Sequence, residues 1–262
     1  MATIYEYTSI GSFALSTKWA SYENAVVRSL PAVYRLTANG QAYDMQQGAS
    51  RPIGVAEITL RGGIYGSSAA NMATDVDALL ALHNTTQTVT RTRTSGGSTQ
   101  TATCRILVDW DAATREHTLF VPFTVRMVPV ARTQFFGTTR NYSAESKTTG
   151  YAESLTNSGN DQNYDAIITL SVASGTVTDP TFTIGSAEMK YTGTLSGALT
   201  ITCGALTATV GGSSVLDDWA PTSNHAVTEW LPIPTGSNSL TLTFTGGGAA
   251  NMTVAYKDAY RL

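Results

Sequence analysis

Three histidines, His83, His117 and His225, are the bases that a nucleophilic or acid–base site in this 262-residue chain could use. A serine nucleophile on a strand-to-helix turn needs Gly-x-Ser-x-Gly, and a zinc protease needs His-Glu-x-x-His. The sequence has neither pattern, nor paired cysteine ligands, nor a glycine loop for phosphate. His83 ends a predicted helix, where the helix dipole favours a histidine, so we interpret it as structural. The sequence predicts no catalytic residue, no zinc site and no cofactor.

The segment Asp161-Gln162-Asn163-Tyr164-Asp165 has the Asp-x-Asn-x-Asp spacing that collects oxygen ligands around calcium. A calcium loop of this kind needs Gly at its sixth position and a bidentate Glu at its twelfth. Here those positions hold Ala166 and Val172. We therefore interpret the segment as a polar loop that leads into a strand, and we predict no metal site.

Several acids could provide the carboxylate pair of a glycoside hydrolase, which must face each other across a sugar. Glu145 and Glu153 are close in sequence, and Asp217-Asp218 precede Trp219. Nothing in the sequence places any of these acids opposite a partner at the required separation. Glycoside hydrolysis is thus the weakest of three functional hypotheses.

Aromatic side chains near these acids suggest a sugar-stacking platform, because a flat ring packs on the apolar face of a sugar. The candidate residues for glycan contact are Trp219 and Tyr191. Trp230, in Glu229-Trp230-Leu231-Pro232, is predicted to be a core residue instead. A carbohydrate-binding module or adhesin that recognises cell-surface glycans is therefore an alternative hypothesis.

The elements that must position these residues are mainly strands. Charged residues make up only 13% of the chain, and its 23 Gly far outnumber its 8 Pro, which suits short strands joined by tight turns. The one convincing helix spans Ser68 to His83, with Ser67 or Ser68 as N-cap. Its apolar stripe, at helical spacing, comprises Met72, Val76, Leu79, Leu80 and His83. We expect this helix to lie across a β-sheet.

A Thr-rich hairpin from Thr88 to Arg105 follows the helix. Val89, Arg91 and Arg93 alternate with threonines along its first strand, so neither face is predicted to be apolar enough for a core. We expect such a hairpin to project and to be covered by solvent or by a neighbouring subunit. The interface candidates are Thr90, Arg91, Thr92, Arg93 and Arg105. By contrast, Cys104, Ile106, Val108, Leu119, Val121, Phe123, Val125 and Met127 are predicted core positions on two strands.

Two domains are expected, residues 1–137 and 138–262. The first carries 11 Lys or Arg against 9 Asp or Glu, whereas the second carries 5 against 10. The predicted fold class is mainly β: an N-terminal β-sandwich with one helix and an extended hairpin, then a C-terminal jelly-roll-like β-sandwich. The strands expected in the second domain are Tyr142–Ser146, Ala166–Ser174, Thr181–Ile184, Met189–Tyr191, Leu199–Cys203, Leu206–Val210, Ala226–Leu231, Ser239–Thr245 and Met252–Tyr256.

Charge and cysteine usage exclude other classes. No cluster of Lys and Arg is interleaved with aromatics, so we predict no specific nucleic-acid binding. No apolar run reaches the length of a membrane span, and the N-terminal residues lack the pattern of a signal peptide, so we expect no membrane association. Cys104 and Cys203 are predicted to be buried free thiols.

Read in order, the chain resembles the distal tail protein family of long-tailed, non-contractile bacteriophages. The second half carries the resemblance in an apolar strand after a loop, a Gly-rich strand pair, a Pro-rich segment before a strand and a Tyr-rich final strand: Tyr164–Val172, Leu199–Gly212, Trp230–Asn238 and Val254–Tyr260. The first half agrees in layout through Phe13-Ala14-Leu15, Asn39-Gly40, Arg51-Pro52, the helix, the hairpin and Val128-Pro129. The chain departs from the family at Ile233-Pro234-Thr235, which lengthens a turn, and at Val128, where an acid is common.

The resemblance implies a structural virion protein, not an enzyme. It implies a ring, usually a homohexamer, that joins the tail tube to the tail-tip hub or baseplate. The N-terminal domain would build the ring, and a galectin-like or carbohydrate-module-like C-terminal domain would lie outside it. Implied partners are further copies of the chain, the tail tube protein, a tail-tip hub or tail-associated protein and, in host adsorption, a receptor-binding protein or host glycan. Implied localisation is the phage tail tip, after synthesis in the host cytoplasm without a signal peptide.

Overall fold

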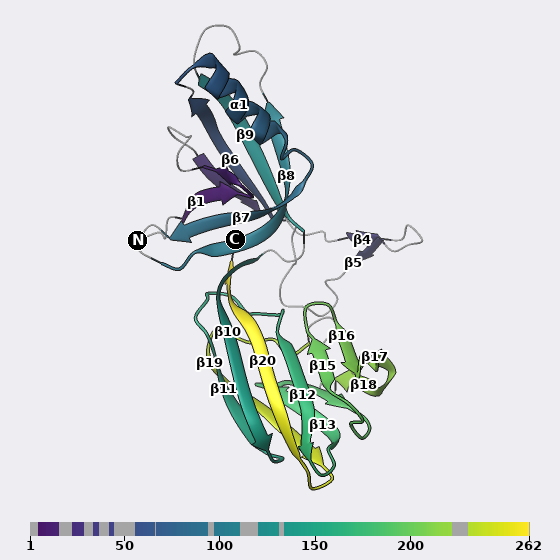
Figure 1. Cartoon of the computed structure of the whole chain (residues 1–262). Helices are drawn as coiled ribbons and strands as arrows, with labels where there is room; N and C mark the ends of the chain where they lie inside the picture. Colours follow the sequence, from purple (N-terminus) through teal and green to yellow (C-terminus); the bar gives the residue numbers. More distant parts are fainter. Residues whose placement is uncertain are drawn as a thin grey trace. The chain divides into compact units, whose positions relative to one another are not determined.

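The structure is a computed structural model that describes residues 5–15, 23–28, 34–36, 42–44, 56–65, 67–93, 97–110, 120–130, 134–221 and 230–261 (Figure 1). These residues form mainly antiparallel strands and one α-helix, which confirms the predicted mainly β fold class. The chain divides into two compact units. Unit 1 comprises residues 1–136 with the last two residues, and unit 2 comprises residues 137–260.

The strands of unit 1 follow the order β3-β6-β9-β8-β7-β1-β2. Their bounds are β1 Tyr5–Ile10, β2 Phe13–Ala14, β3 Glu23–Arg28, β6 Ala56–Tyr65, β7 Thr86–Arg93, β8 Gln100–Trp110 and β9 Phe120–Pro129. Strands β4 (Tyr34–Leu36) and β5 (Ala42–Asp44) pair with each other as a separate hairpin. The start of β10 (Gln134–Lys147) joins β8 where Phe136 pairs with Thr101.

The core of unit 1 lies on one face of β6, β9 and β8. Strand β6 pairs with β9 from Ile58–Met127 to Tyr65–Phe120, and β9 pairs with β8 from Cys104–Pro129 to Trp110–Phe123. Because side chains alternate across a strand, every second residue enters the core. The buried set includes Ile58, Leu60, Ile64, Cys104, Ile106, Val108, Val121, Phe123, Val125 and Met127, which confirms the predicted core positions on β8 and β9 apart from Leu119, outside the described residues.

Helix α1 spans Ala69–Leu80 and lies against β6. The predicted N-cap is confirmed at Ser68, whose Oγ accepts a hydrogen bond from the Asn71 backbone N–H. Val76 and Leu79 are buried as predicted, but Leu80 is 37% exposed, so its place on the buried stripe was wrong. The helix also ends before His83, because the Leu82 and His83 N–H groups bond the carbonyls three residues back and tighten the chain into a turn.

Unit 2 is a sandwich of two antiparallel sheets. One sheet has the order β17-β16-β15-β12-β20-β10, and the other has β11-β19-β13-β14-β18. The bounds are β11 Tyr151–Asn157, β12 Ile167–Ser174, β13 Thr178–Ile184, β14 Ala187–Tyr191, β15 Leu199–Thr202, β16 Thr207–Val210, β17 Ser213–Ser214, β18 Trp219–Pro221, β19 Gly236–Thr245 and β20 Ala249–Arg261, with a 3₁₀ helix η2 at Leu216–Asp218. The inner faces share one core, which includes Leu155, Ile168, Leu170, Phe182, Met189, Leu199, Ile201, Leu240, Leu242, Met252 and Val254.

Three expectations for this unit need correction or qualification. Strand β11 was not predicted, because its inward positions alternate between apolar and polar side chains and include the buried Asn157. The domain boundary expected at residue 137 lies within the continuous strand β10, and the two units divide between Phe136 and Gly137. The strand expected at Ala226–Leu231 falls mostly outside the described residues, and Trp230 and Leu231 lie buried without belonging to a strand.

Candidate functional site

Strand β7, the first strand of the predicted interface hairpin, is an internal strand of unit 1. It pairs with β1 from Tyr5–Arg93 to Ile10–Val89 and with β8 from Thr86–Arg105 to Arg91–Gln100. Both backbone edges of β7 are therefore used within the chain. The expectation that this strand projects without a core face was wrong, because Val89 and Arg91 are 0% and 1% exposed.

Arg91 is a core residue, which corrects its assignment as an interface candidate. Its Nε donates to Gln100 Oε1 at 2.9 Å, and its guanidinium carbon lies 3.7 Å from the centre of the Phe135 ring. Tyr7 packs edge-on against the same ring, with 6.1 Å between ring centres. An arginine can be buried in this way because its planar, weakly hydrated head stacks on aromatic faces. The sequence pattern missed this because a charged residue at a strand position indicates solvent by default.

The other interface candidates lie in different settings. Thr90 and Thr92 are partly exposed on β7, and the Thr90 carbonyl accepts a hydrogen bond from Thr8 Oγ1. Arg105 is exposed on β8, and its Nε and Nη2 both donate to Asn84 Oδ1. The side chain of Arg93 lies outside the described residues. Of the three arginines, only Arg105 is shown with its guanidinium at the surface.

Of the three histidines, His83 lies among the described residues, and its ring makes a structural contact. The Val108 backbone N–H donates to His83 Nδ1 at 3.0 Å, which ties the turn after α1 to β8. His117 and His225 lie outside the described residues. Cys104 and Cys203 are buried free thiols, as predicted. Burial raises the pKa of the Cys104 thiol to about 12, so this sulfur stays protonated and unreactive at neutral pH.

The two glycan-contact candidates are neighbours across the β14–β18 pair, where Tyr191 is opposite Trp219. Tyr191, however, is only 8% exposed and belongs to the core of unit 2, so its ring offers no stacking face to a sugar. That assignment was wrong. The Trp219 side chain lies outside the described residues, so its role stays a prediction. Trp230 is buried in the same core, as predicted.

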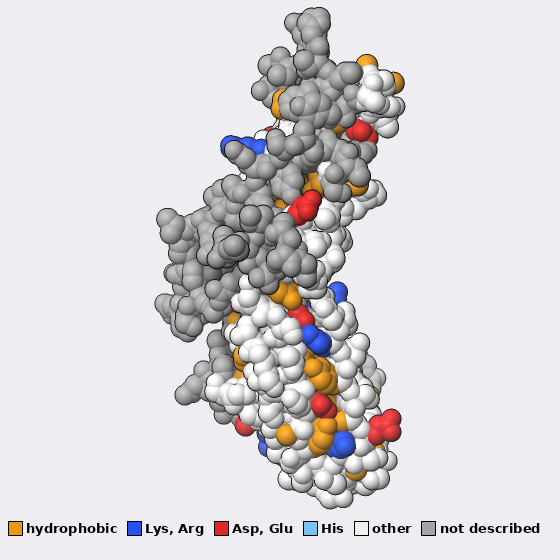
Figure 2. Space-filling model, turned by 90° about the vertical axis from the view of Figure 1, so that its left-hand side faces the viewer, with side chains coloured by type: hydrophobic (Ala, Val, Ile, Leu, Met, Phe, Trp, Pro, Cys, Tyr) orange, Lys and Arg blue, Asp and Glu red, His pale blue; other side chains and the backbone are white. Residues whose placement is uncertain are grey.

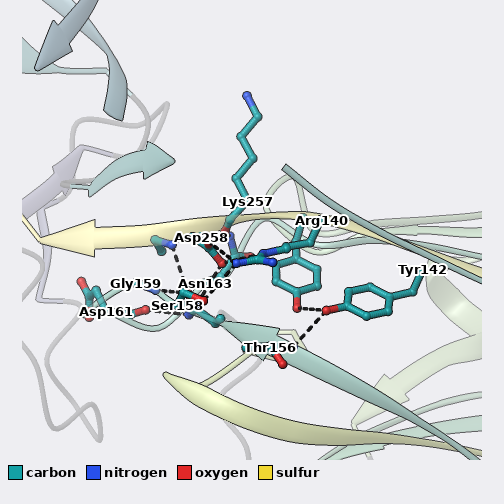
Figure 3. A network of polar contacts seen from close by, with 12 residues as sticks. Arg140, Tyr142, Thr156, Ser158, Gly159, Asp161, Asn163, Lys257 and Asp258 are labelled. Atoms are coloured by element: carbon teal, nitrogen blue, oxygen red, sulfur yellow. Dashed lines mark hydrogen bonds and ion pairs between the residues drawn. The ribbon is translucent and has the colours of Figure 1, made fainter. Parts of the chain in front are cut away.

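A polar network in unit 2 gathers residues that sequence reasoning missed (Figure 3). Asp258 on β20 is 1% exposed, and its two carboxylate oxygens accept hydrogen bonds from Arg140 Nε and Nη2 at 3.2 and 2.9 Å. The Ser158 backbone N–H donates to Asp258 Oδ1, and Arg140 Nη2 also donates to Ser158 Oγ. The bond to the Asp258 carboxylate raises the pKa of Arg140. The network thus joins β10, β20 and the loop after β11.

Two buried asparagines continue the network. Asn157 donates to the Asp161 and Ile233 carbonyls and accepts from the Gly159 and Ala259 N–H groups. Asn163 donates to the Lys257 carbonyl at 2.7 Å and accepts from the Asp165 N–H. The Asn157 side chain thus makes four hydrogen bonds to backbone groups and the Asn163 side chain makes two, as buried polar groups require. These contacts fix the loop from Asn157 to Asp165 against β20.

The same loop contains the Asp161-x-Asn-x-Asp spacing considered above for calcium. Asp161 Oδ1 accepts from the Gln162 N–H, while the Asn163 side chain bonds Lys257 and Asp165 (Figure 3). The spacing therefore serves hydrogen bonds within the loop and to β20. Among the described residues, no group of three or more His, Cys, Asp or Glu is placed to hold a metal ion.

Tyr142, on β10, contacts Thr156 (Figure 3) and packs against Tyr256 on β20. Their rings stack with centres 5.9 Å apart and an interplanar angle of 7°. Tyr142 Oη accepts from the Thr156 backbone N–H at 3.2 Å, which links β10 of one sheet to β11 of the other. Burial, followed by the contact with Tyr142, raises the pKa of Tyr256. The arrangement closes one side of the sandwich and presents no activated nucleophile.

The acids considered for glycoside hydrolysis lie in different settings. Glu153 Oε2 accepts from the Tyr151 hydroxyl at 2.5 Å, whereas Glu145 is exposed on β10. Asp217 and Asp218 are exposed in η2.

In the part of the chain that is described, no helix has the length and apolar character needed to cross a membrane.

Comparison with known proteins places the fold. The Dit protein of phage SPP1, described as a paradigm of the hub adsorption apparatus in phages that infect Gram-positive bacteria, is similar over 98% of this chain and 99% of its own, with a TM-score of 0.57 and 13% identity. The fold of this chain is that of the SPP1 Dit protein. Chains of the phage P2 baseplate in its activated conformation, with Ca and with Sr, match 97% of this chain and 90% of theirs at TM-scores of 0.32 and 0.29, with 8% and 9% identity.

No family model matches the sequence, and no curated protein matches it. The likeness to the SPP1 protein is therefore one of fold, at an identity too low to transfer individual residues.

Proposed function

We propose that this protein is a structural component of a phage tail tip, where copies of it form a ring that joins the tail tube to the tail-tip hub or baseplate. The observation that carries the proposal is the extent of the fold likeness to the SPP1 Dit protein, which covers 98% of this chain and 99% of that one. A match of this extent includes both units in sequence order, so it concerns the whole architecture rather than one common β-sandwich. The proposed role requires no catalytic residue and no cofactor.

The proposed ring uses unit 1, and its order is six. Because β7 is internal, a neighbouring copy cannot add a strand to it, and contact must be made through exposed side chains or through other strands. Arg105 is the interface candidate that this setting favours, since its guanidinium is at the surface and is oriented by Asn84. Arg93, Thr90 and Thr92 remain secondary candidates.

The further proposed partners are the tail tube protein on one side of the ring and a hub or tail-associated protein on the other. Unit 2 lies outside the ring, where a receptor-binding protein is its proposed contact. The proposed localisation is the phage tail tip. The net charge of unit 2, with 4 Lys or Arg against 10 Asp or Glu, is unsuited to binding nucleic acid.

Light scattering after size-exclusion chromatography, with negative-stain imaging of the same fractions, tests the ring. We expect particles with a mass close to six times the 27.7 kDa of the chain and a central opening. The substitution Arg105→Glu should reduce the ring fraction several-fold, whereas Lys257→Glu, an equal charge change at an exposed position of unit 2, should leave it unchanged. A strict monomer at every concentration, with no ring particles, would refute the proposal.

A further inference from the structure

The peptide bond between Asp179 and Pro180 is the single Asp–Pro bond of the sequence, and it lies in an irregular part of β13. The pairing of β13 with β19 shifts register between Thr178 and Thr181, which marks a bulge. Within it, Asp179 has a φ of 55°. A residue before a proline normally has an extended backbone with φ about −120°, and a residue other than glycine is strained at positive φ. The backbone on the amino side of this bond is therefore strained.

The carbonyl group of the same bond is polarised. The Thr181 hydroxyl donates a hydrogen bond to the Asp179 carbonyl oxygen at 3.3 Å. A donor at this position stabilises the negative charge that develops on a carbonyl oxygen during nucleophilic attack. Pro180 contributes on the other side of the bond, because the nitrogen of a proline is more basic than other peptide nitrogens and so leaves more easily when it is protonated. The bond thus combines an activated carbonyl with a good leaving group.

The Asp179 side chain brings a nucleophile and a proton donor to this bond. Its Oδ1 accepts a hydrogen bond from the Gly193 N–H at 2.8 Å, and its Oδ2 lies 3.2 Å from Lys190 Nζ. The Gly193 N–H and then Lys190 lower the pKa of Asp179, so the carboxylate is ionised at neutral pH. Lys190 carries the proton that a leaving nitrogen needs, and it becomes a free amine once that proton is given up.

An ion pair alone assigns nothing, because oppositely charged side chains also lie close together elsewhere on unit 2 (Figure 2). Arg140 and Asp258 form such a pair, but no proline follows Asp258. The bulge does not require this pair either. An asparagine tolerates positive φ and could accept the Gly193 N–H equally well. The combination of carboxylate, lysine and proline at Asp179 is what calls for an explanation.

We propose that the Asp179–Pro180 bond is a self-processing site, at which the chain opens and Lys190 captures the Asp179 side-chain carboxyl group as an isopeptide. This activity goes beyond the proposed ring and does not depend on it. The product carries a covalent link between β13 and β14, and the strained backbone at Asp179 is released.

The reaction uses only groups that are present in the ion pair. An Asp179 carboxylate oxygen attacks the Asp179 carbonyl carbon and forms a five-membered cyclic anhydride. The bond to Pro180 breaks, and its nitrogen takes a proton from the Lys190 ammonium group. The Lys190 amine then attacks Cγ of the anhydride, the main-chain carboxylate of Asp179 leaves, and the surplus proton passes to the Pro180 amine. One carboxylate and one ammonium group are present before and after, and no water is consumed.

The position of Lys190 decides the product. Water can open an anhydride as well, because the Asp179 and Lys190 side chains are partly exposed. An amine already held against the carboxyl group reacts as if it were highly concentrated, so it captures the anhydride before water does. Glu188, the other charged residue of β14, accepts a hydrogen bond from the Thr183 hydroxyl and is not needed for the reaction.

Prolonged warming of the folded full chain at neutral pH, followed by peptide mapping, tests the proposal. Trypsin cuts the unprocessed chain after Lys190 and releases residues 148–190 and 191–257. An isopeptide on this lysine blocks that cut, so the processed chain gives a branched peptide in which residues 148–179 are joined to residues 180–257. We expect this peptide to accumulate with time, while the mass of the whole chain stays unchanged.

Three variants assign the roles. Asp179→Asn removes the nucleophile but keeps an acceptor for the bulge, and it should abolish the branched peptide. Lys190→Arg keeps the positive charge but has no amine that can attack, so any opened chain should appear as the separate fragments 1–179 and 180–262. Glu188→Gln is the control, since it makes the same charge change as Asp179→Asn on the neighbouring strand, and it should process as the wild type does.

Several results would overturn the proposal. One is a folded wild type in which N-terminal sequencing finds no new chain beginning at Pro180. Another is a wild type that yields only separate fragments, and a third is equal branched product from Lys190→Arg or from the chain unfolded in urea. Circular dichroism verifies that each warmed variant is folded. Ring particles in the electron microscope bear on the proposed function alone, so the two proposals fail separately.

Discussion

Each of the two units buries a charged side chain, but the partners lie at very different distances along the sequence. In unit 1, Arg91 donates to Gln100, nine residues later on the paired strand, and the Phe135 ring completes the contact. In unit 2, Asp258 accepts from Arg140, 118 residues earlier, and from the Ser158 N–H, 100 residues earlier. The first arrangement combines a contact within a hairpin with one ring from β10, whereas the second needs β10, β20 and the loop after β11 to be in place together.

This difference has consequences for folding and for tolerance to change. A hairpin contact closes a short loop at little entropic cost, while contacts across more than 100 residues require most of unit 2 to be ordered first. We therefore expect the Arg91 cluster to stabilise one sheet and the Asp258 network to act as a late closure of the whole sandwich. Substitutions at the two sites test this contrast.

Charge reversal at Arg91 should have the largest effect. Arg91→Glu places a carboxylate against the Phe135 ring and the Gln100 amide oxygen in a site that is 1% exposed, which should cost about 4 kcal/mol or more. At an interface, as the sequence suggested for Arg91, this change would leave the monomer folded; in the buried site it should unfold unit 1. Urea unfolding, monitored by circular dichroism, measures the loss in the free energy of unfolding.

Arg105→Glu is the matched control for this reversal, because Arg105 is exposed and should change the free energy of unfolding by about 0.5 kcal/mol or less. If Arg91→Glu and Arg105→Glu unfold at the same urea concentration, then Arg91 is not a core residue, and the contrast between the two units fails.

Removing the partner of Asp258 should have the next largest effect. Arg140→Leu leaves a carboxylate that is 1% exposed without its ion pair, and breaking a buried pair from one side costs about 3 to 5 kcal/mol. The control is Arg126→Leu, which breaks the Arg126–Asp109 pair, whose side chains are 40% and 52% exposed, and should cost about 1 kcal/mol or less. Equal losses for the two variants would show that the network is a surface feature.

Helix α1 offers a test within unit 1 that involves no charge. Leu79 is fully buried, so Leu79→Ala should cost about 2 to 5 kcal/mol through lost burial and the cavity left behind. Leu80→Ala, on the next residue and 37% exposed, should cost well under half as much. Differential scanning calorimetry compares the two; a larger loss for Leu80→Ala would mean that the helix packs through a different face.

Features that depend on neighbouring residues could be predicted from the sequence, whereas features that depend on long-range contacts could not. Period-two alternation located β8 and β9 and their core residues, and Ser68 was identifiable as a cap because capping depends on neighbours along the chain. Arg91 was wrongly assigned to the surface because its burial depends on the Phe135 ring of β10. Tyr191 was wrongly assigned to a sugar-stacking surface because neighbouring residues do not distinguish a core tyrosine from an exposed one.

Strand β11 and the polar network were missed for a related reason. The inward residues of β11 include Glu153 and Asn157, so its apolar alternation is broken. Asn157 is buried because backbone groups of Asp161, Ile233 and Ala259 satisfy it, and two of those lie at the far end of the sequence. No window of neighbouring residues contains that information.

The smallest expected effect concerns pH and the edge of unit 2, where Tyr151 donates to Glu153. That hydrogen bond, with burial second, raises the pKa of Tyr151 to about 12, above the usual value of about 10 for tyrosine. Because the folded-state pKa is raised, the stabilisation is fully present below pH 10 and is lost as the pH rises through 12. Ultraviolet absorbance titration of the wild type minus Tyr151→Phe should show one phenol ionising near pH 12, and in Glu153→Gln that ionisation should move down towards 10. A Tyr151 that ionises at the ordinary value in the wild type would mean that the edge of the sandwich is open, unlike the closed network around Asp258.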